Sequence, residues 1–147
     1  MAELILYYGL KRHLPRVHWV RLENVVTSGL PDLEGAYSDQ SAWLELKERP
    51  RVTAPVYVRP SQRNWWLERT RVSRHLWLLV YTTAGQGVTL HPCREALPRL
   101  RPAGGSLKTS WQLAPEDLRA TTRHRFGYKD PEGWGALCEI VFTSRPS

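Results

Sequence analysis

The hydrophobic and polar residues of this chain follow patterns that predict helices and strands within one domain. Residues 2–14 carry apolar side chains at helical spacing and are followed by Pro15, which predicts a short amphipathic helix. Residues 17–26 are rich in β-branched and aromatic side chains and predict a strand. Residues 75–82 are continuously apolar, so we expect a strand in the centre of a sheet.

Two further strands, at residues 32–37 and 41–47, are separated by a short polar turn and predict an antiparallel hairpin. Such a hairpin would bring Asp32 close to Glu45. Successive side chains of a strand point to opposite faces, so Glu45 and Lys47 share one face of the second strand. The pattern therefore predicts two acids and one lysine at one place.

The sequence after this hairpin predicts a proline- and arginine-rich loop, an insertion at residues 48–60, followed by a helix. Ser61 is the expected N-cap of that helix, which would run to about Val72 with Gln62 and Trp66 one turn apart. A strand is expected at residues 88–91. Beyond them we expect helices at 93–100 and 114–122 and a strand at 136–143.

The order of these elements predicts one α/β (α+β) core and an extension. The core would comprise residues 1–92, and residues 93–147 would pack on or beside it as a C-terminal appendage. We find no pattern in the appendage that predicts a second hydrophobic core. A length of 147 residues is typical of a single domain.

The net positive charge of the chain indicates the kind of molecule it binds. Lys and Arg number 21 against 14 Asp and Glu, and 17 of the basic residues are arginine, whose planar guanidinium suits phosphate oxygens. This balance favours a polyanionic partner such as DNA, although a basic surface without a partner is the alternative. The two cysteines lack zinc-ligand spacing, and no glycine-rich phosphate loop indicates a nucleotide cofactor.

The sequence shows no apolar run of about 20 residues and no leader-like N-terminus, so we expect a cytoplasmic protein without a membrane partner.

The predicted hairpin carries the ligands that magnesium prefers. Mg²⁺ takes oxygen ligands and commonly binds one or two carboxylates, leaving positions for water and phosphate. Asp32, Glu45 and the backbone carbonyl of Leu46 could supply that shell, with Lys47 holding a water or neutralising charge. The alternative is a surface hairpin with scattered charges.

The ordered set Gly29-x-Pro31-Asp32, Glu45-x-Lys47 and Pro60-Ser61-Gln62 resembles the signature of the PD-(D/E)XK nuclease superfamily. Within it, the chain is most similar to the VRR-NUC and Holliday-junction-resolvase branches, especially their phage-encoded members. The resemblance covers about residues 3–82. It implies a restriction-endonuclease-like α-β-β-β-α-β core, with a mixed central sheet flanked by helices.

The resemblance also implies roles for single residues. Asp32 and Glu45 would bind Mg²⁺, for which Mn²⁺ would substitute, and Lys47 would be the catalytic lysine. Gln62 would position a ligand, water or phosphate beside them. The superfamily also places a glutamate on its first helix, which Glu3 matches.

Glu23 is the rival for this glutamate, because phage members carry a similar Arg-x-Glu-Asn stretch. If Glu3 is the site carboxylate, Glu23 would instead contact the residues that surround the site and pair with Arg21. Four arginines of the insertion and the following helix are predicted to contact DNA phosphates, although a solvated basic loop is the alternative: Arg49, Arg51, Arg59 and Arg63.

These features together predict a metal-dependent endonuclease that acts as a homodimer on Holliday-junction, branched or flap DNA in phage replication or recombination. The alternative is a non-catalytic nucleic-acid-binding or virion-associated protein that keeps the fold.

Overall fold

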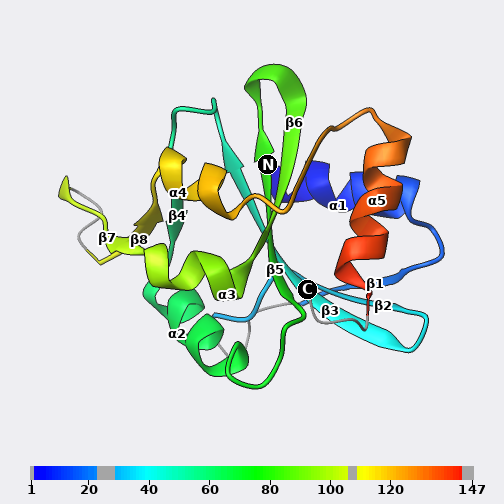
Figure 1. Cartoon of the computed structure of the whole chain (residues 1–147), viewed down its shortest axis with the longest axis horizontal. Coiled ribbons are helices and arrows are strands. Elements are labelled where there is room, and N and C mark those ends of the chain that lie inside the picture. The colour runs from blue at the N-terminus through cyan, green and yellow to red at the C-terminus, as the bar shows by residue number, and fades with distance from the viewer. Residues whose placement is uncertain (1, 23–28, 106–108, 144–147) are drawn as a thin grey trace.

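The computed structural model describes residues 2–22, 29–105 and 109–143, without the side chains of residues 2 and 3. A six-stranded sheet with the order β1-β2-β3-β5-β6-β9 forms its centre (Figure 1). In this sheet β3 and β5 pair in parallel, and all the other neighbouring strands pair antiparallel. The strands are β1 (His18–Arg21), β2 (Leu33–Tyr37), β3 (Gln40–Arg49), β5 (Leu76–Thr82), β6 (Gly87–Pro92) and β9 (His124–Gly127).

Helices cover both faces of this sheet (Figure 1). One face carries α1 (Ala2–His13) and α5 (Pro131–Val141). The other carries α2 (Pro60–Arg69), α3 (Cys93–Ala96) and α4 (Pro115–Thr121), with a small sheet of β4 (Val56–Val58), β8 (Trp111–Leu113) and β7 (Arg101–Pro102). The described elements also include the 3₁₀ turns η1 (Ala84–Gln86) and η2 (Leu97–Arg99). The predicted mixed α/β fold is confirmed.

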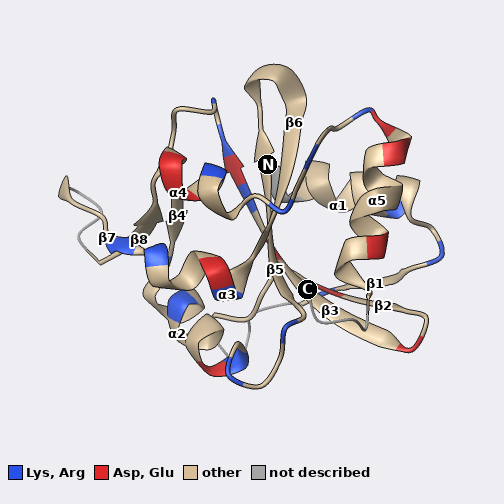
Figure 2. Ribbon diagram, viewed as in Figure 1, with Lys and Arg blue, Asp and Glu red and all other residues tan. Residues whose placement is uncertain are grey.

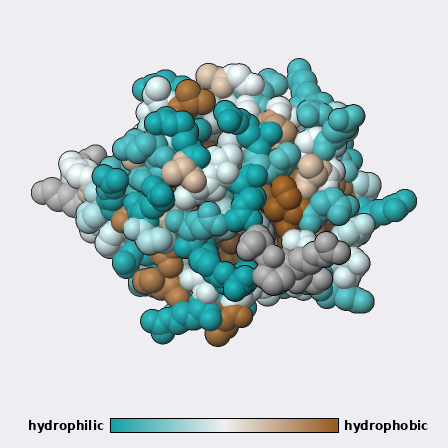
Figure 3. Space-filling view, in the orientation of Figure 1, coloured by the Kyte–Doolittle hydropathy of each residue, from teal (hydrophilic) through white to brown (hydrophobic). Residues whose placement is uncertain are grey.

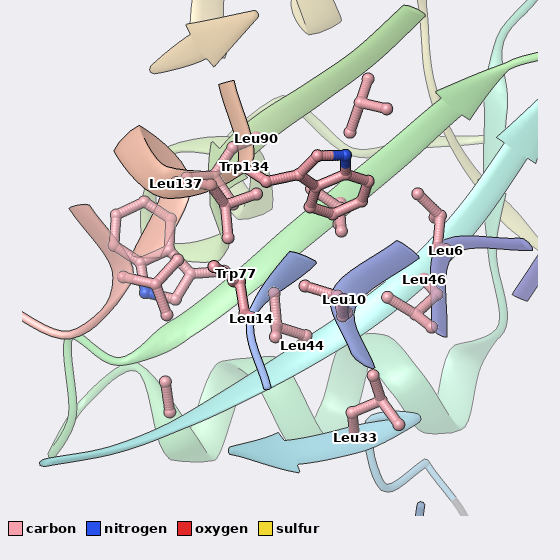
Figure 4. Packing of buried hydrophobic residues seen from close by; sticks show 14 of the residues in the cluster. Leu6, Leu10, Leu14, Leu33, Leu44, Leu46, Trp77, Leu90, Trp134 and Leu137 are labelled. Carbon is pink, nitrogen blue, oxygen red and sulfur yellow. The ribbon is translucent and has the colours of Figure 1, made fainter. Parts of the chain in front are cut away.

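Strand β5 is buried along its whole length, as its apolar sequence predicts. Its alternating side chains separate two hydrophobic clusters. Trp77 and Leu79 pack with the α1 and α5 side, whereas Leu78 and Val80 pack with α2, α3 and α4. Figure 4 shows leucines of α1 beside β3 and β5 in the first cluster. The second cluster was not expected from the sequence, because its residues are scattered over short elements.

The predicted hairpin is confirmed as β2 and β3. Ser38 and Asp39 form its turn with φ angles of 51° and 64°, the left-handed pair that matches the twist of a two-residue hairpin loop. The β2 pairing ends at Leu33 opposite Leu44. Residues 45–49 therefore continue beyond β2 and pair only with β5.

The C-terminal segment corrects one prediction, because residues 136–143 form no strand. They belong mostly to α5, where Trp134, Leu137 and Val141 are buried at helical spacing. Asp130 caps the helix by accepting a backbone N–H bond at 3.1 Å. The β-branched residues of this segment suggested a strand, but the cap and the apolar spacing determine a helix.

Several predicted boundaries also move. Helix α2 begins at Pro60 with Arg59 as its N-cap, so Ser61 is not the cap, and it ends at Arg69 instead of Val72. The insertion contains strand β4. Of the strand expected at residues 17–26, the structure describes His18–Arg21 as strand, while residues 23–26 lie outside the description.

The C-terminal third contributes to both faces of the sheet, through α3 and α4 on one face and α5 on the other, and β9 forms an edge strand. The division at residue 92 stays a prediction. Among the described helices, none is long and apolar enough to span a membrane.

A buried histidine predicts how stability depends on pH. His91 is fully buried, and its ring nitrogens lie 3.0 and 2.8 Å from the hydroxyls of Thr121 and Thr89. Burial, followed by the charge of Arg49, lowers its pKa to about 4. An unfolded histidine titrates near pH 6.5, so the unfolded chain binds the extra proton between these values.

We expect the neutral histidine to contribute stability above about pH 6.5 and to lose it as the pH falls to about 4, by up to about 3 kcal/mol. Urea unfolding at about pH 7 and about pH 4.5 measures this loss. The His91→Gln variant should show a smaller difference between the two values. An equal difference in both proteins would contradict the assignment.

Candidate active site

The loop before β2 is fixed by its contact with α2. Gly29 has a φ of +89°, and a Cβ there would lie 2.1 Å from the backbone oxygen of Ser61. Only glycine combines this conformation with so close an approach. On its other side the loop is held by a backbone hydrogen bond of 2.9 Å from Leu22 to Asp32. The Gly-x-Pro-Asp sequence thus packs Gly29 against the start of α2, three residues before Asp32.

Asp32 contacts the free side of β3. Its Oδ2 accepts a hydrogen bond of 2.8 Å from the Leu46 N–H. The N–H and C=O of one strand residue point to the same side, so the Leu46 carbonyl also faces the side occupied by Asp32. The carboxylate takes the place that a longer β2 would occupy.

Glu45 is the buried acid of the site, with 1% of its surface exposed. Its Oε2 accepts a hydrogen bond of 3.0 Å from Gln62 Nε2 and lies 3.8 Å from Lys47 Nζ. Its Oε1 is buried without a hydrogen-bond partner among the described residues. Burial, and then the negative charge of Asp32, hold the pKa of Glu45 well above its usual value, against the lowering effect of Lys47.

Gln62 connects these groups, which explains why a polar side chain is buried here. Its Oε1 accepts hydrogen bonds from Lys47 Nζ at 3.0 Å and from the Arg59 N–H at 2.9 Å. Its Nε2 donates to Glu45. The same side chain therefore satisfies the first turn of α2 and orients both the acid and the lysine, a linking role that the sequence did not reveal.

The oxygen atoms of the site suit a divalent cation. Asp32, Glu45 and the Leu46 carbonyl offer oxygen atoms, which are the ligands that Mg²⁺ requires. A buried carboxylate oxygen without a partner, beside a second carboxylate, is an arrangement that a cation would stabilise. These residues fit a magnesium ion. Among the described side chains, no three Asp, Glu, His or Cys gather at one point.

The predicted third carboxylate is not located. Glu3 lies on α1, but its side chain is outside the description, and Glu23 lies in the segment 23–28 that is also outside it. Arg21, the expected partner of Glu23, is exposed and places its guanidinium 5.4 Å from the centre of the Tyr7 ring.

The surroundings of Arg49 differ from the open basic loop that the sequence predicts. Its side chain is 5% exposed, and its Nε donates to the Thr82 hydroxyl at 2.9 Å. Its Nη1 donates to the carbonyls of Val52 and Ala54 at 3.2 and 3.4 Å. The position after Lys47 along the same face is inside the protein, so Arg49 holds the insertion in place and does not form part of an open basic loop.

The other three predicted contacts have different surroundings. Arg51 and Arg59 are exposed. Arg63 is half-buried with its guanidinium 4.0 Å from the centre of the Trp111 ring. Figure 2 shows that Lys and Arg occur on many elements and not on one alone. The face shown in Figure 3 is mainly hydrophilic, with separate apolar patches.

The two kinds of arginine predict different effects on stability. Arg49→Ala should lower the free energy of unfolding by about 2–3 kcal/mol, because it leaves the buried Ala54 carbonyl, the partly buried Val52 carbonyl and the Thr82 hydroxyl without this donor. Arg51→Ala, at an exposed position, should change it by less than about 0.5 kcal/mol. Urea unfolding of both variants tests this difference. Equal stability would mean that the Arg49 contacts contribute nothing.

Comparison with known proteins adds information about the fold. No protein family matches the sequence, and no curated protein matches it. Among solved structures, the chain is similar to Hjc, a Holliday junction resolvase from the archaeal hyperthermophile Archaeoglobus fulgidus, with a TM-score of 0.54 and 11% identity over 82% of this chain and 86% of the resolvase. It also aligns with the bacterial homing endonuclease I-Ssp6803I, with a TM-score of 0.44 and 14% identity over 95% and 88% of the two chains. The similarity to the resolvase shows that this chain has a nuclease-like fold of the restriction-endonuclease type.

Proposed function

We propose that this protein is a metal-dependent endonuclease that hydrolyses phosphodiester bonds in DNA. One observation carries the proposal: buried Glu45 lies within the electrostatic reach of Asp32 and 3.8 Å from the Lys47 amine, and its second oxygen lacks a hydrogen-bond partner among the described residues. The fold shared with a Holliday junction resolvase supports it. Two acids beside one amine suit phosphodiester hydrolysis, in which negative charge develops on phosphate oxygens.

In the proposed mechanism Asp32, Glu45 and the Leu46 carbonyl would hold Mg²⁺, for which Mn²⁺ would substitute. When bound, the metal supplies a water of lowered pKa and stabilises negative charge on the phosphate. The Lys47 ammonium orients the attacking water or neutralises charge on a phosphate oxygen. Gln62 fixes the ammonium through its 3.0 Å hydrogen bond. Glu3, or Glu23 in its place, would complete the set of carboxylates.

The proposed substrate is branched DNA, a Holliday junction or a flap, cut by a homodimer, since two symmetric cuts need two sites. A phage origin, the VRR-NUC branch and a role in phage replication or recombination remain predictions from the sequence resemblance. Arg51, Arg59 and Arg63 stay in the proposed DNA-binding set, and so does Arg49, although its side chain is buried.

One observation favours a second candidate, a non-catalytic nucleic-acid-binding protein. Gln62 already satisfies both Lys47 and one oxygen of Glu45. A neutral Glu45, favoured by its raised pKa, would be stable in this network without a metal. In that case the same residues would serve only to join α2 to the sheet.

The experiment that separates the two candidates uses end-labelled four-way junction, flap and linear duplex DNA with Mg²⁺, Mn²⁺ or EDTA. We expect strand cleavage with either metal and none with EDTA, with faster cleavage of a branched substrate than of the duplex. The Asp32→Asn variant is the inactive control. DNA binding without metal-dependent cleavage of any substrate would favour the non-catalytic candidate.

A further inference from the structure

A cavity of about 470 Å³ lies between the residues that follow β3, the β5–β6 hairpin, α4 and β9. Its volume is typical of sites for small organic ligands, which span about 300–1,000 Å³. No carboxylate belongs to its lining. The polar lining consists of three arginines and three threonines: Arg49, Arg119, Arg125, Thr82, Thr89 and Thr122.

Arg49 provides a rigid donor in this cavity. Its Nε and Nη1 are held by Thr82 and by two backbone carbonyls, while its Nη2 makes no hydrogen bond within the described residues. The Thr82 hydroxyl accepts from Arg49, so its own proton remains available to donate. A guanidinium fixed in this way loses little conformational entropy when an anion binds.

The positive charge of the cavity is not neutralised. Arg99 and Arg101 pair with Asp117, and Arg123 pairs with Glu95. In contrast, neither Arg119 nor Arg125 forms an ion pair within the described part of the chain. Burial, and then the charge of Arg119, lower the pKa of Arg49, which indicates that the two guanidiniums repel each other.

We propose that this cavity binds a phosphate group, held by the three arginines and the Thr82 hydroxyl. Arginine forms paired, charge-assisted hydrogen bonds with phosphate, and three like charges around one cavity are stabilised by an anion. Neither Arg119 nor Arg125 was singled out by the sequence. The C-terminal third would thus contribute α4 and β9 to ligand binding.

The phosphate has two possible sources, a DNA strand or free phosphate. Arg49 lies four residues beyond Glu45 on the same face of β3, about 13 Å along the strand. DNA laid along β3 would place in the cavity a phosphate about four nucleotides from the cut. This assignment to DNA rests on the proposed function, whereas binding of a phosphate group does not.

Thermal unfolding in phosphate and in chloride at equal ionic strength, without divalent metal, tests the site. Phosphate should raise the midpoint of the wild-type protein by about 3 °C and leave that of an Arg119→Ala/Arg125→Ala variant unchanged. Arg71→Ala/Lys129→Ala removes two exposed charges that do not line the cavity and should respond like the wild type. An equal phosphate effect in all three proteins, or none in the wild type, would overturn the proposal.

DNA binding without divalent metal identifies the source of the phosphate. If it is DNA, the Arg119→Ala/Arg125→Ala variant should bind duplex at least about 10-fold more weakly, with a salt slope smaller by about 2. If it is free phosphate, DNA affinity should equal that of the Arg71→Ala/Lys129→Ala control. Neither readout requires cleavage, so a wild-type protein that cuts no DNA would contradict the endonuclease and leave the phosphate result interpretable.

Discussion

Lys47→Met is expected to reduce the rate of DNA cleavage by about 10³-fold. The lysine ammonium lies 3.0 Å from Gln62 Oε1 and 3.8 Å from Glu45 Oε2, and it is the amine of the site. Methionine keeps the length of the side chain and removes the charge. Single-turnover cleavage of labelled DNA in Mg²⁺ measures the loss.

The matched control for this variant is Lys129→Met, which removes an exposed lysine on the loop before α5 and should cleave at the wild-type rate. Unfolding of the two variants should be compared as well, so that a loss of cleavage is not confused with a loss of structure. Cleavage by Lys47→Met at the rate of the control would exclude the lysine from the chemistry.

Gly29→Ala is expected to destabilise the protein by more than about 2 kcal/mol and to disturb the site. The positive φ of this position disfavours alanine, and the new Cβ would meet the Ser61 carbonyl at 2.1 Å. This oxygen belongs to the backbone of α2, so relief requires the loop with Asp32 to move away from the helix with Gln62. Urea unfolding and metal binding measure the two consequences.

The Gly85→Ala variant separates the cost of the positive φ angle from the cost of a steric clash. Gly85 has a similar φ of +83°, but no atom beyond its neighbouring residues lies within 4 Å of the place of its Cβ. This substitution should therefore lower the free energy of unfolding by only about 1–2 kcal/mol and leave metal binding unchanged. If Gly29→Ala is no more destabilising than Gly85→Ala, the close approach of Gly29 to α2 does not account for the requirement for glycine.

The hairpin and the central strand could be predicted because their patterns are local. Alternation along β3 predicts that Leu44 and Leu46 lie on one face of the strand. In the structure these leucines are in the hydrophobic cluster, whereas Glu45 and Lys47 contact each other on the opposite face. The polar residues at 38 and 39 tolerate the positive φ angles of a tight turn. A short-range pattern thus predicted the proximity of Asp32 to β3.

The errors arose where distant contacts decide the outcome. Alternation places Arg49 on the same face as Lys47, but only the tertiary structure shows that Thr82 and the insertion enclose it. Gln62 forms hydrogen bonds with Lys47 on β3 and with the backbone at the N-terminus of α2. No local sequence pattern shows that these two segments lie side by side. The β-branched composition after residue 136 concealed the helical spacing of α5.

Binding of Mn²⁺ to the DNA-free protein tests most directly whether Asp32 and Glu45 form a metal site. Calorimetric titration of the wild-type protein should show binding with release of a proton, because the metal must displace the proton favoured by the raised pKa of Glu45. Asp32→Asn and Glu45→Gln, which keep the shapes of both side chains, should weaken binding by at least about 10–100-fold. Proton release should disappear in Glu45→Gln. Equal affinity in all three proteins, or no binding by the wild type, would contradict the account.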